Sequence, residues 1–252
     1  MKKIIIIPAR LNSSRLPKKL LLDLCGKTIL RRVYEQCKKV NDVKVYIATD
    51  SLLIKNEAAS FTKNIIMTKS SHISGTERVV EAASNIDYDM IVNVQGDEPF
   101  IKPKLIEDLF NSLEKSDTII SSAMQRIKKK KDLINPNCVK VITDKNNDAI
   151  CFSRCIIPHI KEDVEKVWDN NGIIYDRFNF YKHIGVYGYK KNFLDSYLKL
   201  KKSSLENLER LEQLRVIENG IRINMIETKH HSVSIDTMED YKYALKLIKG
   251  DN

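Results

Sequence analysis

The feature that most constrains the fold is a regular alternation of apolar runs and helix-patterned segments in the first half of the chain. The first run, residues 4–7, consists of four isoleucines, as expected of a parallel strand that is covered on both faces. Further strands are predicted at residues 43–48, 64–67 and 90–94. Helices are predicted between and after them, at residues 29–37, 51–61, 76–86 and 103–113. This alternation predicts right-handed crossovers and a parallel sheet.

The second half of the chain has a different pattern. Strands are predicted at residues 118–124, 139–143, 149–153, 181–189 and 221–226. The leucine spacing over 205–217 predicts one amphipathic helix that ends at Gly220, and Thr237 with Asp240 predicts the start of the last helix. Residues 158–179 are polar and irregular, as in a long functional loop. We therefore expect an α/β fold whose second half carries a mixed or antiparallel β insertion.

The composition leaves three interpretations of the charge open. Lys and Arg number 43 against 33 Asp and Glu, a formal net charge of +10, which suits a nucleic-acid surface, a pocket for a polyanion or a lysine-rich surface. We interpret the lysine run at 128–131 as solvated surface. The five cysteines contain no C-x-x-C, so we expect reduced thiols without disulfides or zinc. No stretch approaches the roughly 20 apolar residues of a membrane span, and we expect a soluble, cytoplasmic protein.

A cationic loop follows the first strand, at the position where open α/β sheets bind their ligands. Residues 8–19 carry Arg10, Arg15, Lys18 and Lys19 directly after the apolar strand. Their guanidinium and ammonium groups suit a polyphosphate. The segment contains neither G-x-x-x-x-G-K-[ST] nor G-x-G-x-x-G. A solvated basic turn is the alternative.

Two carboxylates are candidates for a magnesium site. Asp97 follows the predicted strand at 90–94 and a glycine, and we expect it to face the cationic loop. Asp236 lies between a strand and the last helix. Mg²⁺ accepts one or two carboxylates together with waters and substrate phosphates. The alternatives are an ordinary turn with a helix cap at Asp97 and a neighbour of the helix N-cap at Asp236.

The other candidates each have a structural alternative. The helix start at residues 71–78 suits an anion or a base edge, whereas His72 by itself suits a surface or capping role. His183 stands in a predicted strand, where a histidine is commonly structural. The pair Glu212–Gln213 interrupts the leucine face of its helix and is compatible with solvent exposure. Arg154 follows a strand, where it either clamps a substrate carboxylate or ends the strand.

Motifs along nearly the whole chain resemble those of the 3-deoxy-manno-octulosonate (Kdo) cytidylyltransferases. The first four are I-P-A-R-x-x-S-S-R-L-P-x-K at 7–19, S-G-T-E-R at 74–78, N-V-Q-G-D-E-P at 93–99 and N-P-N-x-V-K at 135–140. The others are F-S-R at 152–154, H-I-G-V-Y-G-Y at 183–189, L-E-x-L-E-Q-L-R at 208–215 and I-D-T-x-E-D at 235–240. As an ordered set these motifs are specific.

The resemblance implies a three-layer, Rossmann-like fold similar to that of nucleotide-diphospho-sugar transferases, with a mixed sheet, helices on both faces and a small β insertion. It implies one cytidylyltransferase domain over residues 1–252, with a sugar-binding and dimerisation insertion around 125–200. The implied enzyme is a homodimer that couples CTP to Kdo, releases pyrophosphate and supplies lipopolysaccharide synthesis. Nucleic acid and membrane are not implied partners.

The resemblance also implies roles for individual residues. The implied catalytic residues are Arg10, Lys19 and Asp97. The implied nucleotide-binding residues are Pro8, Ala9, Arg10, Arg15, Lys19, Ser74, Gly75 and Arg78. The implied sugar-binding residues are Gln95, Arg154, His183, Tyr187, Glu212 and Gln213. Two Mg²⁺ ions are implied at Asp97 and Asp236. Lys18 stands where a glycine is expected, which leaves open whether Lys18 or Lys19 contacts phosphate.

Alternative functions remain distinguishable. A cytidylyltransferase for 8-amino-Kdo stays open, because that sugar differs from Kdo by a single hydroxyl-to-amine change. A cytidylyltransferase for a sialic acid is disfavoured, because the loop at residues 8–19 lacks the glycine-rich sequence that is typical of such enzymes. A nucleic-acid binder is disfavoured by the absence of a recognition motif and of an aromatic-studded basic strand. A catalytically silent paralogue is disfavoured, because this chain retains all the candidate residues for binding metal and phosphate, which such a protein does not need.

Overall fold

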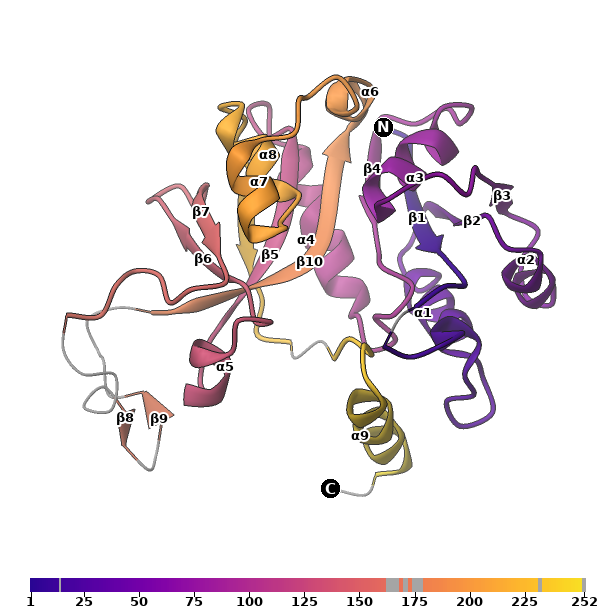
Figure 1. Ribbon diagram of the computed structural model, residues 1–252. Helices are drawn as coiled ribbons and strands as arrows, with labels where there is room; N and C mark the ends of the chain where they lie inside the picture. The colour runs from indigo at the N-terminus through magenta and orange to yellow at the C-terminus, as the bar shows by residue number, and fades with distance from the viewer. Residues whose placement is uncertain (14, 162–167, 170–171, 174–178, 231–232, 251–252) are drawn as a thin grey trace.

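The structure is a computed structural model that describes the chain except residues 14, 162–167, 170–171, 174–178, 231–232 and 251–252. The strands of its main sheet are β1 (Lys3–Ala9), β2 (Val43–Thr49), β3 (Ile65–Met67), β4 (Met90–Asn93), β5 (Ile120–Arg126), β6 (Lys140–Thr143), β7 (Ala149–Ser153), β10 (Tyr181–Lys190) and β11 (Asn224–Glu227). Their order is β11-β5-β10-β4-β1-β2-β3, and β6 branches from β10 and pairs with β7 (Figure 1).

The parallel half of the sheet confirms the strands predicted in the first half of the chain. β1 pairs in parallel with β2 and β4, and β2 pairs in parallel with β3. Ile5 and Ile7 of β1 pack into one hydrophobic core, whereas Ile4 and Ile6 pack into the other. Four consecutive isoleucines are therefore needed because both faces of β1 are covered. The carboxyl ends of β1 and β4 lie at the same edge of the sheet, so their loops meet there.

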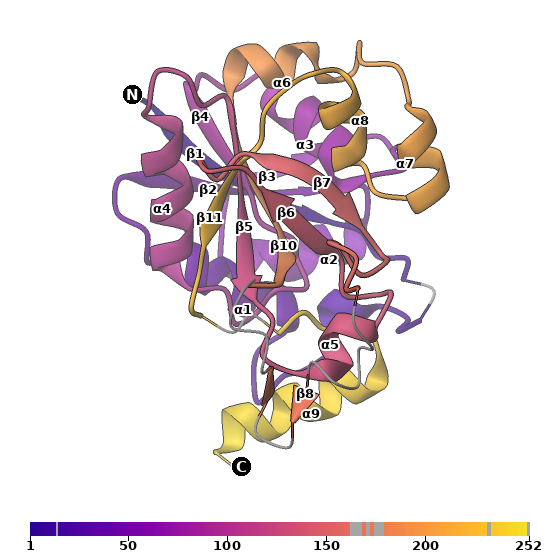
Figure 2. The same cartoon turned by 90° about the vertical axis from the view of Figure 1, so that its left-hand side faces the viewer.

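Helices cover both faces of the sheet, as Figures 1 and 2 show from two directions. One core receives buried side chains from α1 (Ile29–Cys37), α2 (Leu52–Ala59), α4 (Pro103–Leu113) and α9 (Met238–Lys249). The other core receives them from α3 (Gly75–Ala83), α6 (Lys191–Tyr197) and α8 (Gln213–Glu218). The expected three-layer α/β fold with a mixed sheet is confirmed.

The second half of the chain adds antiparallel strands to this sheet. β10 lies between β4 and β5 and is antiparallel to both, while β11 is parallel to β5. β10 belongs to the range 125–200 but is part of the main sheet, whereas β6 and β7 form the side branch. The register between β10 and β5 shifts between Ile184 and Tyr187. Such a bulge bends a strand and re-aims its side chains.

The prediction of one continuous helix over 205–217 is wrong. The chain forms α7 (Ser204–Glu209) and then α8, because Arg210 adopts a left-handed conformation with φ 54°. Leu208, which the leucine spacing placed on a buried face, is 81% exposed. An ion pair between Glu206 and Arg215, both nearly buried, joins the two short helices. A period of hydrophobic residues cannot reveal such a break, because the leucines on both sides of it keep the helical spacing.

Several short elements were not predicted. They are the 3₁₀ helix η1 (Lys19–Leu21), α5 (Lys130–Ile134), which begins within the lysine run, and α6. In the predicted loop 158–179, β8 (Trp168–Asp169) pairs with β9 (Gly172–Ile173), and all other positions from 162 to 178 lie outside the described residues. No helix in the described part of the chain is long and apolar enough to cross a membrane.

Candidate active site

Two adjoining cavities lie at the carboxyl ends of β1 and β4. The charged cavity, of about 170 Å³, is lined among others by Pro8, Arg10, Arg15, Lys19, His72, Ser74, Gly75, Arg78, Gln95, Asp97 and Asp236. The aromatic cavity, of about 390 Å³, is lined among others by Arg10, Ser74, Gly75, Thr76, Gln95, His183, Tyr187, Tyr189, Tyr197, Arg210, Glu212 and Gln213. Arg10, Ser74, Gly75 and Gln95 line both cavities, so these residues form the boundary between them.

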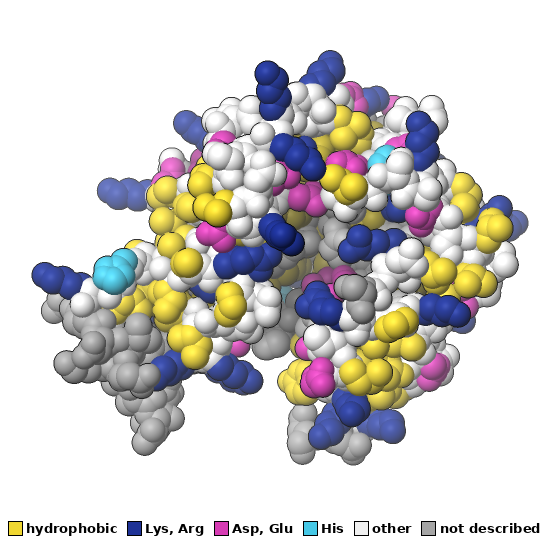
Figure 3. All heavy atoms as spheres, in the orientation of Figure 1, with side chains coloured by type: hydrophobic (Ala, Val, Ile, Leu, Met, Phe, Trp, Pro, Cys, Tyr) yellow, Lys and Arg dark blue, Asp and Glu magenta, His cyan; other side chains and the backbone are white. Residues whose placement is uncertain are grey.

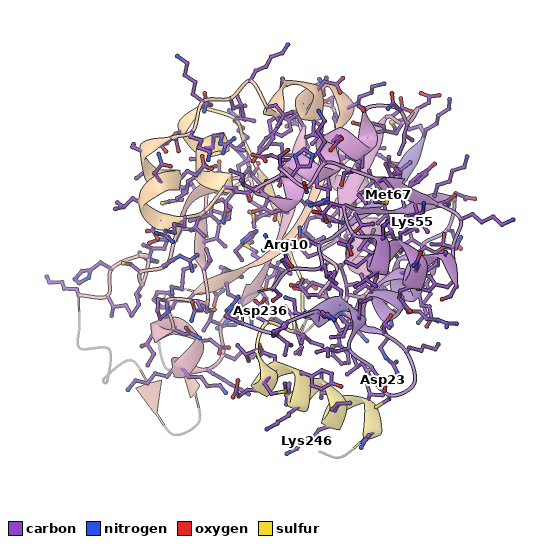
Figure 4. The ribbon with its side chains drawn as sticks, turned by 45° about the vertical axis from the view of Figure 1, so that its right-hand side comes forward. Arg10, Asp23, Lys55, Met67, Asp236 and Lys246 are labelled. Atoms are coloured by element: carbon purple, nitrogen blue, oxygen red, sulfur yellow. The ribbon has the colours of Figure 1, made fainter. Side chains whose placement is uncertain are left out.

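The pictures place this region in the middle of the molecule. The space-filling view shows a hollow across the centre of one face, with Lys and Arg side chains along its rim (Figure 3). Figure 4 shows Arg10 and Asp236 in the central region, whereas Asp23 and Lys246 lie toward the periphery. The central position agrees with a site built from both halves of the sheet.

Lys19 joins the two predicted metal ligands. Its Nζ lies 2.5 Å from Asp97 Oδ2 and 2.9 Å from Asp236 Oδ1, and Arg15 also pairs with Asp236 at 3.2 Å. The backbone N–H of Ile235 donates to the carbonyl of Asp97 at 3.0 Å and fixes the C-terminal segment beside the loop after β4. Burial lowers the pKa of Lys19, but the ion pairs and hydrogen bonds with Asp97 and Asp236 outweigh this effect and raise it above its ordinary value. The ammonium is therefore charged and holds the two carboxylates together.

The geometry separates Lys18 from Lys19. Lys19 is buried and lines the charged cavity, whereas Lys18 is exposed and lines neither cavity. Lys18 adopts a left-handed conformation with φ 53°. Glycine reaches this region without the Cβ clash that other residues meet, which explains physically why a glycine was expected there. Of the two lysines, Lys19 is therefore the one that lines the charged cavity.

The start of α3 supplies a polar edge to both cavities. Ser74 caps the helix, because its side chain accepts from the backbone N–H of Glu77. A Cβ on Gly75 would lie 3.2 Å from Gln95 Oε1, so the absence of a side chain lets Gln95 approach the helix start. Gln95 in turn donates to Asn93 Oδ1 at 3.2 Å. Close packing therefore fixes the amide that lies at the boundary of the cavities.

Arg78 is turned toward protein partners in this structure. It is 4% exposed, pairs with Asp50 at 3.2 Å and donates to the hydroxyl of Thr68. Arg78 still lines the charged cavity. These partners neutralise its charge and anchor α3 to the ends of β2 and β3, so its contribution to a bound anion is smaller than that of an unpaired arginine.

His183 is held as a neutral ring in the aromatic cavity. Its Nε2 lies 3.0 Å from Ser122 Oγ, which itself donates to the carbonyl of Val186 at 2.9 Å. A hydroxyl has one proton to donate, so Nε2 must carry the ring proton and Nδ1 remains an acceptor. Burial lowers the pKa of His183 to about 3. The ring packs against Phe152 and Tyr187, with centroids 5.0 and 5.3 Å away.

Glu212 is the acidic group of the aromatic cavity. Burial raises the pKa of its carboxyl, although hydrogen bonds from the hydroxyls of Thr76, Ser74 and Tyr197 offset part of this effect. The Tyr197 hydroxyl lies 3.3 Å from Glu212 Oε2. The neighbouring Gln213 is 8% exposed and lines the same cavity. Glu212 is the N-cap residue of α8 and Gln213 is its first residue, so the break at Arg210 brings both to the cavity wall.

Two of the predicted site residues line neither cavity. Ala9 is the last residue of β1 and is fully buried in the hydrophobic core. Arg154 donates from Nε to the carbonyl of Glu209 at 2.8 Å and from Nη1 to the carbonyl of Pro136 at 3.1 Å. The structure therefore places Arg154 at the junction of β7 and α7. The other predicted site residues line one or both cavities.

Several residues that line the cavities were not predicted as site residues, among them Thr76, Tyr189, Tyr197 and Arg210. Thr76 follows Gly75 along the chain, and alternation along β10 could have indicated Tyr189 from its spacing to Tyr187. Tyr197 is far from any predicted site residue in the sequence and reaches Glu212 only through the fold. Arg210 also lines the aromatic cavity. It could not be selected, because a continuous helix places it on a solvent-facing side. No group of three His, Cys, Asp or Glu side chains in the described ranges forms a metal cluster.

Comparisons with known proteins identify the family of this chain. A sequence profile for the cytidylyltransferase family matches residues 4–223. The chain belongs to the cytidylyltransferase family. A relative from Fusobacterium nucleatum, named 3-deoxy-manno-octulosonate cytidylyltransferase, is 40% identical over 100% of this chain and 99% of its own length. A relative of the same name from Francisella tularensis subsp. novicida is 42% identical over 96% of this chain and 97% of its own length.

Solved structures extend the comparison to the fold of this cytidylyltransferase. A structure of CMP:2-keto-3-deoxy-manno-octonic acid synthetase complexed with CTP is 33% identical, covers 100% of both chains and has a TM-score of 0.90. A 4-diphosphocytidyl-2C-methyl-D-erythritol synthase from Anaerococcus prevotii is 14% identical with a TM-score of 0.64 over 98% of this chain and 96% of its own, which shows the fold alone. The resemblance identified from the motifs is confirmed, and the chain is a nucleotidyltransferase.

Proposed function

We propose that this cytidylyltransferase transfers CMP from CTP to the anomeric hydroxyl of Kdo, releases pyrophosphate and forms CMP-Kdo for lipopolysaccharide synthesis. The observation that carries the proposal is the convergence of Lys19, Asp97 and Asp236 in a charged cavity that adjoins an aromatic cavity. A reaction between a nucleoside triphosphate and a sugar needs two such neighbouring sites with different chemistry.

The charged cavity suits the triphosphate. Arg10, Arg15 and Lys19 line it, and the first two are exposed enough to turn toward an anion. The anomeric hydroxyl attacks an α-phosphate that is already anionic, so alignment and charge neutralisation supply most of the acceleration. These cations hold the triphosphate and stabilise the departing pyrophosphate. Ser74 and Gly75 at the start of α3 face the cytosine and ribose side.

The carboxylates of Asp97 and Asp236 suit Mg²⁺. Both converge on one ammonium, so their oxygens already lie close together. Mg²⁺ takes few protein carboxylates and completes its shell with water and substrate phosphates, which fits a site with two Asp side chains. We assign both residues as ligands of two ions. When bound, Mg²⁺ supplies Lewis-acid polarisation of the α-phosphate and charge neutralisation.

The aromatic cavity suits the sugar. With a proton on Nε2 and a pKa of about 3, His183 accepts a sugar hydroxyl at Nδ1 and does not act as a general acid near neutral pH. Gln95, Glu212 and Gln213 add acceptors and donors, and Tyr187 provides an apolar wall. The chain needs no covalent intermediate, because the nucleophile belongs to the sugar.

We also propose that the protein is a homodimer and acts in the cytoplasm, where the CTP pool lies. The edge strand β7 exposes Ile150 at 54%, and neighbouring α7 exposes Leu208 at 81%. Exposed apolar side chains on an edge strand and an adjacent helix support a contact between copies. Light scattering coupled to gel filtration tests the dimer, and a mass of one chain at micromolar concentration contradicts it.

The experiment for the proposed function is pyrophosphate release from CTP and Mg²⁺ with Kdo, 8-amino-Kdo and a sialic acid in parallel. We expect release with Kdo that EDTA abolishes. Asp97→Ala should lose turnover, whereas Asp108→Ala, which removes a carboxylate paired with Lys104 on α4, should keep it. Preference for 8-amino-Kdo changes the sugar but keeps the reaction, and absence of release with every sugar contradicts the proposal.

A further inference from the structure

An acid sugar brings a carboxylate into the aromatic cavity, and this carboxylate needs a cation. Burial of an unpaired carboxylate is costly. His183 is neutral and Glu212 is acidic, so Arg10 and Arg210 are the fixed cations among the residues that line this cavity. Arg10 also lines the charged cavity, where the triphosphate competes for it. On the basis of the proposed function, we propose that Arg210 binds the carboxylate of the sugar substrate.

Arg154, the arginine expected to clamp this carboxylate, is committed elsewhere. Its Nε and Nη1 donate to the carbonyls of Glu209 and Pro136. Its backbone N–H donates to Glu209 Oε2 at 3.0 Å. If the Arg154 side chain turned toward a ligand, the carbonyl groups of Glu209 and Pro136 would lose these hydrogen bonds. Arg154 is therefore a positioning residue for the segment that follows Glu209.

A network of hydrogen bonds made by Lys140, Arg154 and Glu209, called the polar bracket below, fixes the residue that precedes Arg210. Glu209 accepts from Ser153 Oγ at 2.6 Å as well as from Arg154, so its carboxylate is tied to the end of β7. Lys140, whose side chain is fully buried, donates to the carbonyl of Arg154 at 2.6 Å and to those of Asn135 and Cys138. The bracket thus ties α7 to β6 and β7, and it gives the N-P-N-x-V-K motif a structural role.

The backbone at Arg210 then turns toward the cavity. Its left-handed conformation, φ 54° and ψ 48°, ends α7 and precedes Leu211, Glu212 and Gln213, which all line the same cavity. A non-glycine residue keeps such a conformation when its surroundings determine it. The bracket on one side and the buried start of α8 on the other supply that constraint. The break between the helices therefore presents Arg210 at the cavity.

The guanidinium of Arg210 is available for a ligand. It is exposed, and it makes no hydrogen bond or ion pair with any residue that the structure describes. A planar guanidinium binds a carboxylate through two parallel hydrogen bonds, which a point charge such as lysine cannot reproduce. A carboxylate bound there lies in the same cavity as Glu212, so Arg210 also separates the two negative charges.

The first test compares Arg210→Ala with Arg210→Gly. Glycine tolerates φ 54° and removes the guanidinium without backbone strain, so this variant keeps the test valid if the alanine variant unfolds. We expect both variants to raise the KM for Kdo by roughly 10- to 100-fold, the size of a lost charge-assisted hydrogen bond. The KM for CTP should stay within about 2-fold. Arg222→Ala is the matched control, because it removes an exposed arginine whose nearest carboxylate is 3.9 Å away on Asp148.

The second test uses the methyl ester of Kdo, in which the carboxylate is neutral. The unmodified protein should show a higher KM for the ester than for the acid, and the Arg210 variants should show nearly equal KM values for both. A variant that keeps both the KM for Kdo and the discrimination against the ester overturns the role of Arg210 and leaves the proposed reaction intact. Absence of turnover with Kdo in the unmodified protein overturns the reaction and the role together.

Discussion

Replacement of Lys19 by methionine tests the charge balance of the proposed active site. The Lys19 side chain is 9% exposed, whereas those of Asp97 and Asp236 are 24% and 39% exposed. Loss of one partner of a buried ion pair costs about 3–5 kcal/mol. Water reaches both carboxylates, so we expect the lower cost of about 1–3 kcal/mol in the free energy of unfolding. At about 2–4 °C per kcal/mol for a chain of this size, the melting temperature should fall by about 2–12 °C.

Mg²⁺ should stabilise the Lys19→Met variant against thermal unfolding more strongly than it stabilises the unmodified protein. Without the ammonium, the two carboxylates lack a cation, so Mg²⁺ binds the free protein more tightly than in the presence of Lys19. Mg²⁺ at 100 times its dissociation constant stabilises by about 2.7 kcal/mol, which offsets most of the loss. Thermal unfolding with and without Mg²⁺ measures this effect. The rate of pyrophosphate release by the variant should also fall by roughly 100-fold or more, as expected for loss of a preorganised charge.

Lys18→Met is the control for Lys19→Met. It removes an adjacent lysine that is exposed and lines neither cavity, so its melting temperature and its response to Mg²⁺ should match those of the unmodified protein. A Lys19→Met variant that melts at the unmodified temperature and gains no additional stability from Mg²⁺ contradicts the proposed role of the Lys19 ammonium. Equal effects of the two substitutions also refute it.

Two further predictions concern stability. Glu212→Gln should melt at a higher temperature than the unmodified protein at pH 8, because the folded-state pKa of Glu212 lies above its ordinary value of 4.5 and ionisation therefore costs stability. This difference should shrink as the pH falls through the raised pKa toward 4.5, and a difference that grows on acidification contradicts the assignment. Gly188→Ala should lower the free energy of unfolding in urea by about 1–3 kcal/mol, because its Cβ would lie 2.5 Å from Ser121 Oγ and 3.0 Å from Leu113 Cδ1. Gly185→Ala on the same strand has open space and should unfold at the unmodified urea concentration.

The parallel half of the fold could be predicted because each local signal agrees with the others. The isoleucine run of β1 is apolar at every position, and Pro103 and Ser51 stand at the helix starts that the structure shows. The approach of Asp97 to the cationic loop followed from one topological rule, that loops after parallel strands share an edge, whereas the place of Asp236 beside it was implied by the resemblance. These features depend on short-range patterns or on a general property of sheets.

The features that could not be predicted depend on contacts between segments far apart in the sequence. The left-handed backbone of Arg210 carries no sequence signal, because arginine rarely adopts it and the neighbouring leucines keep a helical period. The partners of Arg154 depend on Glu209, which is 55 residues away along the chain. The position of Arg154 after a strand was visible, but whether its side chain turns to a cavity or to a carbonyl depends on tertiary packing.

The late position of Asp236 has a consequence for protein synthesis. A nascent chain that has emerged through α4 already contains β1, β4, Lys19 and Asp97, and so most of the charged cavity. It lacks the second carboxylate and the Ile235 N–H that binds the carbonyl of Asp97. A prematurely terminated chain that ends before residue 235 therefore retains the parallel strands but cannot assemble the Lys19 ion-pair triad. In this molecule, a segment that is synthesised after β11 completes the proposed catalytic centre.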